Sequence, residues 1–350
     1  MKNSEQFLDA VVRADNLTTW EQSNIKQMRI VQCGILHLAD RYGMNGKDLP
    51  YDNYAIGSIC NRADVSGGAI HRVSDESFKA HMNEYFNVAK DEKFSIVNVY
   101  NGTIFAAHSQ NYKILNIKDC VSELFRYIDC NYPDAEVKGF YVDPIATMVD
   151  IALNSPEISD KYANALNLKI SDTIYPVLRF VTSNTGWSGA NLIPLIYINK
   201  RTLITSEPII LKHEGKATVD KFAKNCEMSF SLMLEGAEKL NELSQISIEY
   251  PVNCAANIAQ EIKLPKKATV ELLHDMEDDY GQAMATAKDV YLYLSKLVLL
   301  YDDEVKKFKM ADQLSRALSL DFTKFDRASA TWLKESTEDN YYQNFNRMSA

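Results

Sequence analysis

The sequence has little glycine, proline and cysteine, and it has no long apolar run. With 13 Gly and 9 Pro in 350 residues, collagen-like and Pro-rich scaffolds are excluded. Apolar residues make up 46% and charged residues 24%, the proportions of a folded globular protein. The longest apolar runs, 192–198 and 292–300, are shorter than the roughly 20 residues that cross a bilayer. The N-terminus has no basic start followed by an apolar core, so we expect a soluble protein without a secretion signal.

Cysteine and histidine are too scattered to predict a metal site. Six cysteines, at positions 33, 60, 120, 130, 226 and 254, form no C-x-x-C pair, and we expect buried thiols rather than disulfides. The six histidines show neither H-E-x-x-H nor H-x-H spacing. Gly215-Lys216 resembles the end of a phosphate loop, but the upstream glycine of a Walker motif is absent. We therefore expect no metal and no cofactor.

In the first half of the chain the apolar period changes from that of a helix to that of a strand. The first forty residues are predicted to be helical, because apolar positions from Ile25 to Leu38 recur every three or four residues. Residues 45–75 are rich in Gly, Asn, Asp and Ser and predict a long loop. Segments 94–100 and 103–108 flank Asn101-Gly102, the strongest hairpin signal in the chain. A strand over 112–117, a helix around 121–128 and a strand over 137–142 are expected next.

A second β block and a helical C-terminal third follow. Strands are predicted over 173–182, 192–198 and 208–212, where β-branched and aromatic residues are separated by turn residues. A heptad-like apolar stripe predicts a long helix over 217–243, which we expect to pack on the preceding sheet rather than form a coiled coil. Further helices are predicted over 252–263, 266–279, 281–303, 309–318 and 323–334, and the tail after 334 is polar.

These elements predict an α+β fold with a mostly antiparallel sheet built from hairpins and a helical C-terminal half. We expect an N-terminal helical region with a long loop at 1–93 and an α+β sheet core at 94–246. A helical C-terminal region at 247–335 and a tail at 336–350 complete the predicted organisation.

Charge is unevenly distributed along a chain whose formal net charge is −9. Residues 197–226 include six basic and three acidic residues, which gives this segment a net charge of +3. Residues 271–304 include nine acidic residues and two lysines, which gives this segment a net charge of −7. The chain therefore has a basic middle and an acidic end, and this asymmetry is more informative than the total charge.

The loop at 183–189 is the segment whose composition is most typical of a binding loop. It joins Ser183, Asn184, Thr185, Trp187 and Ser188 with two glycines between two predicted strands. Its hydroxyls and backbone N–H groups could hold an anion, and the Trp could stack on a base, although a plain turn has the same composition. Gly186-Trp187-Ser188-Gly189-Ala190 nearly matches a hydrolase nucleophile elbow, but a strand follows it where an elbow needs a helix.

Two segments together resemble a known family. Residues 107–116, followed by an amphipathic helix, are similar to a strand and helix of the phage- and plasmid-borne proteins of domain-of-unknown-function family 932. The 183–189 loop, then Lys200-Arg201, then His213-Glu214-Gly215 keep the order of that family's loop, basic strand and H-x-G step. The β-β-β-α order at 174–243 is also similar to the core of phage single-strand annealing proteins, which oligomerise and hold a DNA strand in a basic groove. The resemblance implies a mobile-element origin and a location in the cytoplasm of a bacterial host.

The first hypothesis is a protein that binds single-stranded nucleic acid in replication or recombination, with homo-oligomerisation implied by the annealing proteins. Its predicted footprint combines basic side chains with two aromatic rings for stacking. These residues are Lys200, Arg201, Lys212, His213, Lys216, Lys221, Lys224, Trp187 and Tyr197.

The second hypothesis is a non-enzymatic interaction protein, an anti-defence inhibitor or nucleic-acid mimic. It would bind a basic host protein through its acidic helical half, with Glu277, Asp278 and Asp279 in the contact. An enzyme acting through Ser188 ranks lowest, because no general base can be assigned beside that serine.

Overall fold

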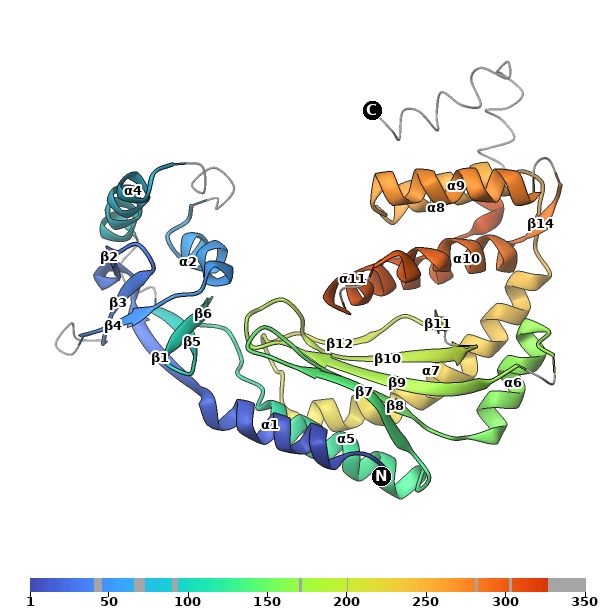
Figure 1. Ribbon diagram of the computed structural model, residues 1–350, viewed down its shortest axis with the longest axis horizontal. Coiled ribbons are helices and arrows are strands. Elements are labelled where there is room, and N and C mark those ends of the chain that lie inside the picture. The colour runs from blue at the N-terminus through green and yellow to red at the C-terminus, as the bar shows by residue number, and fades with distance from the viewer. Residues whose placement is uncertain are drawn as a thin grey trace, which may run out of the picture. The chain divides into compact units, whose positions relative to one another are not determined.

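The protein has an α+β fold with antiparallel sheets, and its C-terminal half is helical in part, as the sequence predicts. The computed structural model describes residues 1–40, 46–65, 73–89, 94–169, 172–199, 201–280, 283–301 and 304–326 (Figure 1). The chain divides into two compact units, which we call the first unit and the second unit. The first comprises Met1–Ile151, Arg179–Leu192 and Ile210–Cys226, and the second comprises Ala152–Leu178, Ile193–Ile209 and Glu227–Ala350.

The first unit opens with helix α1 (Glu5–Leu17), which buries Phe7 and Val11 on one face. The ring of Phe7 lies 5.7 Å from that of Phe125 in helix α5 (Ile117–Asn131) and 5.5 Å from that of Phe140 in strand β7 (Glu136–Val142). Tilted aromatic pairs of this kind add to the stabilisation from apolar burial. Helix α5 and strand β7 confirm the elements predicted around 121–128 and over 137–142.

The predicted hairpin is present in a three-stranded antiparallel sheet. Strand β1 (Thr18–Asn24) pairs with β5 (Phe94–Tyr100), which pairs with β6 (Thr103–Ser109). Between β5 and β6, Asn101 and Gly102 have φ angles of 46° and 77°. Two successive positive φ angles match the right-handed twist of the flanking strands, which is why Asn-Gly is favoured here.

The helix predicted from Ile25 to Leu38 is wrong. This segment forms the short 3-10 helix η1 (Ile25–Gln27) and two antiparallel strands, β2 (Arg29–Gln32) and β3 (Ile35–Ala39). Gly34 turns the chain between the strands with a φ of 84°, a conformation that glycine adopts without steric cost. The buried positions 28 and 30, and likewise 36 and 38, are two apart, as in strands, whereas Val31, which the helical spacing also counted, is 41% exposed.

The long loop predicted at 45–75 is wrong for much of its length. Residues Gly46–Pro50 form strand β4 beside β3, and the 3-10 helix η2 (Asn53–Ala55) leads into helix α2 (Ile56–Arg62). The Asp52 side chain accepts a hydrogen bond from the backbone N–H of Tyr54 and so caps the start of this helical stretch. Residues 66–72 of the predicted loop lie outside the described residues.

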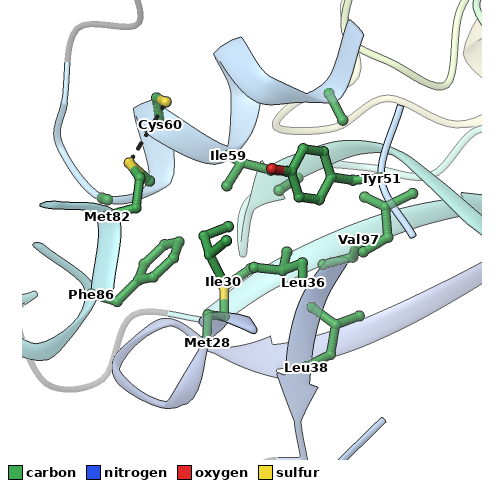
Figure 2. Packing of buried hydrophobic residues seen from close by; sticks show 14 of the residues in the cluster. Met28, Ile30, Leu36, Leu38, Tyr51, Ile59, Cys60, Met82, Phe86 and Val97 are labelled. Atoms are coloured by element: carbon green, nitrogen blue, oxygen red, sulfur yellow. Dashed lines mark hydrogen bonds between the residues drawn. The ribbon is translucent and has the colours of Figure 1, made fainter. Parts of the chain in front are cut away.

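These strands and helices α2 and α4 (Asp75–Val88) enclose a hydrophobic core of their own (Figure 2). The segment from η1 to β3 contributes Met28, Ile30 and Leu36 to this core, and α4 contributes Phe86. Each of these side chains is at most 1% exposed. The thiol of Cys60 lies 3.8 Å from the sulfur of Met82 within this core. All six cysteines are free thiols, and Cys60, Cys120, Cys226 and Cys254 are buried.

A six-stranded sheet has the order β11-β10-β9-β8-β7, with β12 also paired to β10. Its further strands are β8 (Thr147–Ala152), β9 (Ile174–Thr182), β10 (Ala190–Ile198), β11 (Arg201–Ile204) and β12 (Ile209–Leu211). Strands β9, β10 and β12 confirm the three predicted over 173–182, 192–198 and 208–212. Residues 176–182 and 190–196 are buried without alternation, so both faces of β9 and β10 are covered.

Three elements between 109 and 168 differ from the prediction. The strand predicted over 112–117 is wrong, because residues 112–116 form no regular element and lead into α5. Strand β8 and helix α6 (Pro156–Leu166) were not predicted. The carboxylate of Asp150 in β8 accepts two hydrogen bonds from the guanidinium of Arg179 in β9, at 2.6 and 2.7 Å. Both residues are 5% exposed, so each buried charge has a well-placed partner.

Helix α7 (Val219–Ser244) confirms the long helix predicted over 217–243. In the first unit its Phe222 ring lies 5.1 Å from Phe180 of β9. In the second unit Gly236 lies against the Thr205 carbonyl and the Tyr162 hydroxyl. The apolar stripe of α7 therefore packs on the sheet strands and their connections, as expected from its sequence.

The second unit is completed by a group of helices (Figure 1). They are α8 (Pro251–Glu261), α9 (Lys266–Tyr280), α10 (Ala287–Ser295), η3 (Lys296–Leu300), α11 (Glu304–Ser315) and η4 (Arg316–Ser319). The helix predicted over 281–303 begins later than expected, because Ala285–Thr286 forms strand β14, paired with β13 (Ser247–Ile248). A capping box between Thr286 and Asp289 starts α10. The predicted tail after 334 lies outside the described residues, and no described helix has the length and apolar content of a membrane span.

Candidate nucleic-acid interface

The hydroxyls of the 183–189 loop fix the loop to its own unit. Ser183 Oγ donates to the Ile145 carbonyl at 2.6 Å, and Thr185 Oγ1 donates to the same oxygen at 3.1 Å. The backbone N–H of Thr185 donates to Ser183 Oγ. Ser183 is fully buried and Thr185 is 7% exposed. These two side chains therefore shape the loop and do not face a ligand.

Ser188 is held at the far end of the loop. Its hydroxyl donates to the Gly189 carbonyl at 3.0 Å and accepts from the Asn191 amide at 2.9 Å. A Cβ on Gly189 would lie 2.6 Å from the Leu211 carbonyl oxygen, so glycine is required where the loop passes β12. Within the described residues, the Ser188 hydroxyl is hydrogen-bonded to the Gly189 carbonyl and the Asn191 amide and to no histidine or carboxylate.

Four aromatic rings lie together beside the loop, and three of them are stacked. The ring of Tyr112 lies 3.9 Å from that of His108 and 5.0 Å from that of His213, with interplanar angles of 11° and 4°. The ring of Trp20, in β1, lies 5.7 Å from Tyr112 and 6.1 Å from His108. We call Trp20, His108, Tyr112 and His213 the ring column.

Backbone hydrogen bonds hold the ring column in place. His108 Nε2 lies 2.7 Å from the Asn184 carbonyl, and His213 Nδ1 lies 3.0 Å from the Lys113 carbonyl. The Lys113 N–H donates to the His213 carbonyl at 2.8 Å. The predicted loop and the predicted His213 are therefore joined through His108 and Lys113, which the sequence analysis did not select.

Burial keeps the two histidines neutral. It lowers the pKa of His108 to about 4, and it lowers the pKa of His213 below its ordinary value. His213 is 7% exposed and therefore contributes a buried ring, not a surface charge, to the predicted footprint. Gly186 lies against this column with a φ of 77°, and a Cβ there would come within 3.2 Å of His108.

A small cavity in the first unit includes Asn184 of the loop in its wall. It is lined by Asn98, Tyr100, Asp143 and Asn184, among others, and has a volume of about 20 Å³. That volume accommodates one water molecule, and it is far below the roughly 150 Å³ that a benzene ring needs. This cavity is therefore too small to hold a nucleobase.

Exposed lysines flank and follow His213 of the ring column along the chain, and all of them belong to the first unit. Lys212, Lys216, Lys221 and Lys224 are all exposed, the first with 74% of its side chain accessible. Lys113 is exposed too, and its backbone is hydrogen-bonded to His213, next to Lys212. A separation of about one hundred residues hid this fifth lysine from sequence reasoning. The group is partly balanced by Glu214, whose carboxylate lies 3.8 Å from the Lys212 ammonium.

The remaining predicted footprint residues do not belong to this group. Lys200 lies outside the described residues, and Arg201 is described only as backbone at the start of β11. Tyr197 belongs to the second unit, where its ring lies 5.4 Å from Tyr175. Trp187 belongs to the first unit and is partly exposed in the 183–189 loop.

The three acidic residues of the second hypothesis differ in their surroundings on α9. Asp278 is exposed, whereas a carboxylate oxygen of Glu277 lies 4.0 Å from His274. Asp279 accepts a hydrogen bond from the Tyr293 hydroxyl at 2.6 Å. Within the described ranges, no three His, Cys, Asp or Glu side chains gather as a metal site.

The chain matches no protein-family model, no curated protein and no solved structure.

Proposed function

We propose that the first unit binds single-stranded nucleic acid through the exposed lysines beside the ring column. The observation that carries the proposal is the pairing of Lys113 with His213, which adds a lysine from a distant part of the chain to Lys212 and Lys216. The resemblance to single-strand annealing proteins supports the same assignment, and the resemblance to family 932 supports a mobile-element origin, so the proposed role is in phage or plasmid replication or recombination.

The charge of this surface favours a polyanion although the whole chain is acidic. Lys113, Lys212, Lys216, Lys221 and Lys224 carry five positive charges against two negative ones on Glu214 and Asp220, an excess of +3. Five lysine–phosphate contacts would give a logarithmic salt slope of about −3.5 on a single strand. Affinity would then fall about a hundredfold between 50 and 200 mM salt.

Partly exposed aromatic rings supply the second requirement of single-strand binding. Trp20 at the edge of the ring column and Trp187 in the loop are both partly exposed. Base–aromatic stacking contributes about 1–3 kcal/mol per base and tolerates any sequence. We therefore expect binding that depends on strandedness and salt more than on base order.

The test is fluorescence anisotropy of labelled single-stranded and duplex oligonucleotides at 50 and 200 mM salt. The variant Lys212→Glu/Lys216→Glu should weaken single-strand binding at least tenfold, since it reverses two of the five charges. The control Lys266→Glu/Lys267→Glu makes the same charge change on two exposed lysines of α9 in the second unit and should bind as the wild type does. No binding at 50 mM salt, or an equal loss in both variants, would contradict the proposal.

A further inference from the structure

The second unit contains a pocket of ligand size that is separate from the ring column. Its volume is about 570 Å³, within the range of small-molecule sites. It lies among β10, β11, the end of α9, α10 and η3. The lining residues that carry chemistry are Asp279, Tyr280, Asp289, Tyr293 and Lys296.

Aromatic and aliphatic side chains form most of the wall. The rings of Tyr280 and Tyr293 lie 6.0 Å apart at an interplanar angle of 72°. Four aliphatic side chains, from Ile198, Leu203, Leu292 and Leu299, complete the apolar part. A ligand with an apolar portion would lose contact with water on several sides here, which favours binding.

The polar groups of the pocket carry a net negative charge. Asp279 and Asp289 oppose the single ammonium of Lys296, which gives −1. Asp289 is fixed by hydrogen bonds from the Thr286 N–H and hydroxyl, and Asp279 by the hydrogen bond from Tyr293. Neither carboxylate has to reorganise to meet a cation.

Lys296 shows how this wall accommodates a positive group. Its ammonium lies 3.4 Å from the centre of the Tyr293 ring and 3.9 Å from the Asp279 carboxylate. The ring face and the carboxylate thus both attract the same cation. Because the Lys296 side chain is 40% exposed and flexible, it can swing out to water when another cation takes its place.

We propose that this pocket binds a small organic cation, an ammonium group attached to an aromatic or aliphatic body. The ammonium would occupy the position between Asp279 and the Tyr293 ring, and the body would lie against the leucines. An anion of the same size would be repelled by the excess carboxylate. This site is independent of nucleic-acid binding by the first unit.

The test compares three probes of nearly equal shape by isothermal titration calorimetry of the full-length protein. They are 2-phenylethylammonium, the neutral 2-phenylethanol and the anion phenylacetate. The cation should bind at least fivefold more tightly than the alcohol, and phenylacetate should bind most weakly. Absence of binding by the cation, or tighter binding of phenylacetate, would overturn the proposal.

Two matched pairs of variants locate the site. Asp279→Asn should weaken the cation about fivefold and leave the alcohol unchanged, whereas Asp278→Asn, the same charge loss on the neighbouring exposed residue, should have no effect. Lys296→Met should tighten cation binding about threefold, because it removes the internal competitor. Lys267→Met, on an exposed lysine of the same unit, should leave cation binding unchanged. Weaker cation binding in Lys296→Met, or equal losses in the two aspartate variants, would contradict the assignment.

Discussion

His108 combines a titratable ring with a buried position, and this makes the first unit sensitive to acid. Burial in the ring column lowers its pKa to about 4, against an ordinary value near 6.5. The unfolded chain therefore binds a proton in the range where the folded protein does not. The contribution of His108 to the free energy of unfolding is therefore fully present above pH 6.5 and is lost progressively as the pH falls towards 4.

This difference predicts a loss of about 2 kcal/mol in the free energy of unfolding between pH 7 and pH 5 from His108 alone. Because other groups also titrate, the measurement compares urea unfolding of the wild type and His108→Phe at both pH values. The phenylalanine keeps a ring in the stack but does not titrate, so its free energy of unfolding should change less with pH. His81→Phe, at an exposed position of α4, serves as the control. An equal loss in the wild type and in His108→Phe would contradict the prediction.

The hydroxyl residues of the loop show what a sequence can and cannot indicate at this scale. The composition of 183–189 predicts a binding loop, but Ser183 and Thr185 direct their hydroxyls to the Ile145 carbonyl. The acceptor lies 38 and 40 residues away in the chain. No local pattern distinguishes a hydroxyl that faces a ligand from one that fixes a loop.

At the scale of the element, helix α7 contains Gly236, a residue type that destabilises a helix interior but that the packing of α7 requires at this position. Replacing glycine by alanine in an exposed helix interior stabilises it by about 1 kcal/mol. A Cβ on Gly236, however, would overlap the Thr205 carbonyl oxygen and the Tyr162 hydroxyl. We therefore expect Gly236→Ala to lower the free energy of unfolding by about 1–3 kcal/mol, the usual cost of overpacking.

Urea unfolding followed by circular dichroism measures this effect. The control Ser231→Ala changes an exposed position of the same helix and should raise the free energy of unfolding by up to about 0.5 kcal/mol, as propensity predicts. If Gly236→Ala raised stability as Ser231→Ala does, the close packing of α7 at Gly236 would be contradicted.

The hairpin and the long helix carry strong local signals and were predicted correctly, whereas 25–38 and the ring column depend on partners elsewhere in the chain. Asn101-Gly102 defines its hairpin through its own φ angles, and the stripe of α7 is long enough to allow only a helix. The segment 25–38 is ambiguous, because its apolar spacing fits a helix while Gly34 permits a turn between two strands. The ring column joins residues 20, 108, 112 and 213, and no pattern along the sequence connects them.

At the scale of the whole molecule, the core shown in Figure 2 has the properties of a folding unit. It is built from residues between Ile25 and Ala107. Strand β1 pairs with β5, which also pairs with β6. The hydrogen-bonded structure around this core therefore lies within 18–109. A segment with its own core and paired strands is expected to fold by itself.

The last prediction is that the fragment 18–109 folds on its own and that the fragment 1–93 does not. A boundary at 93, where the sequence analysis placed one, would remove β5 and β6 and with them Val97, Val99 and Ile104 of the core. It would also leave β1 without its partner. Proton NMR dispersion and urea unfolding should show a cooperative transition of at least about 3 kcal/mol for 18–109 and none for 1–93.

A matched variant makes that experiment specific to the core. Leu36 is fully buried, and Leu36→Asp would place an unpaired carboxylate among apolar side chains. This variant of the 18–109 fragment should lose the transition, whereas Val31→Asp, at an exposed position of β2, should keep it. If 1–93 unfolded as cooperatively as 18–109, then β5 and β6 would not be needed for the core, and the N-terminal domain would end before them.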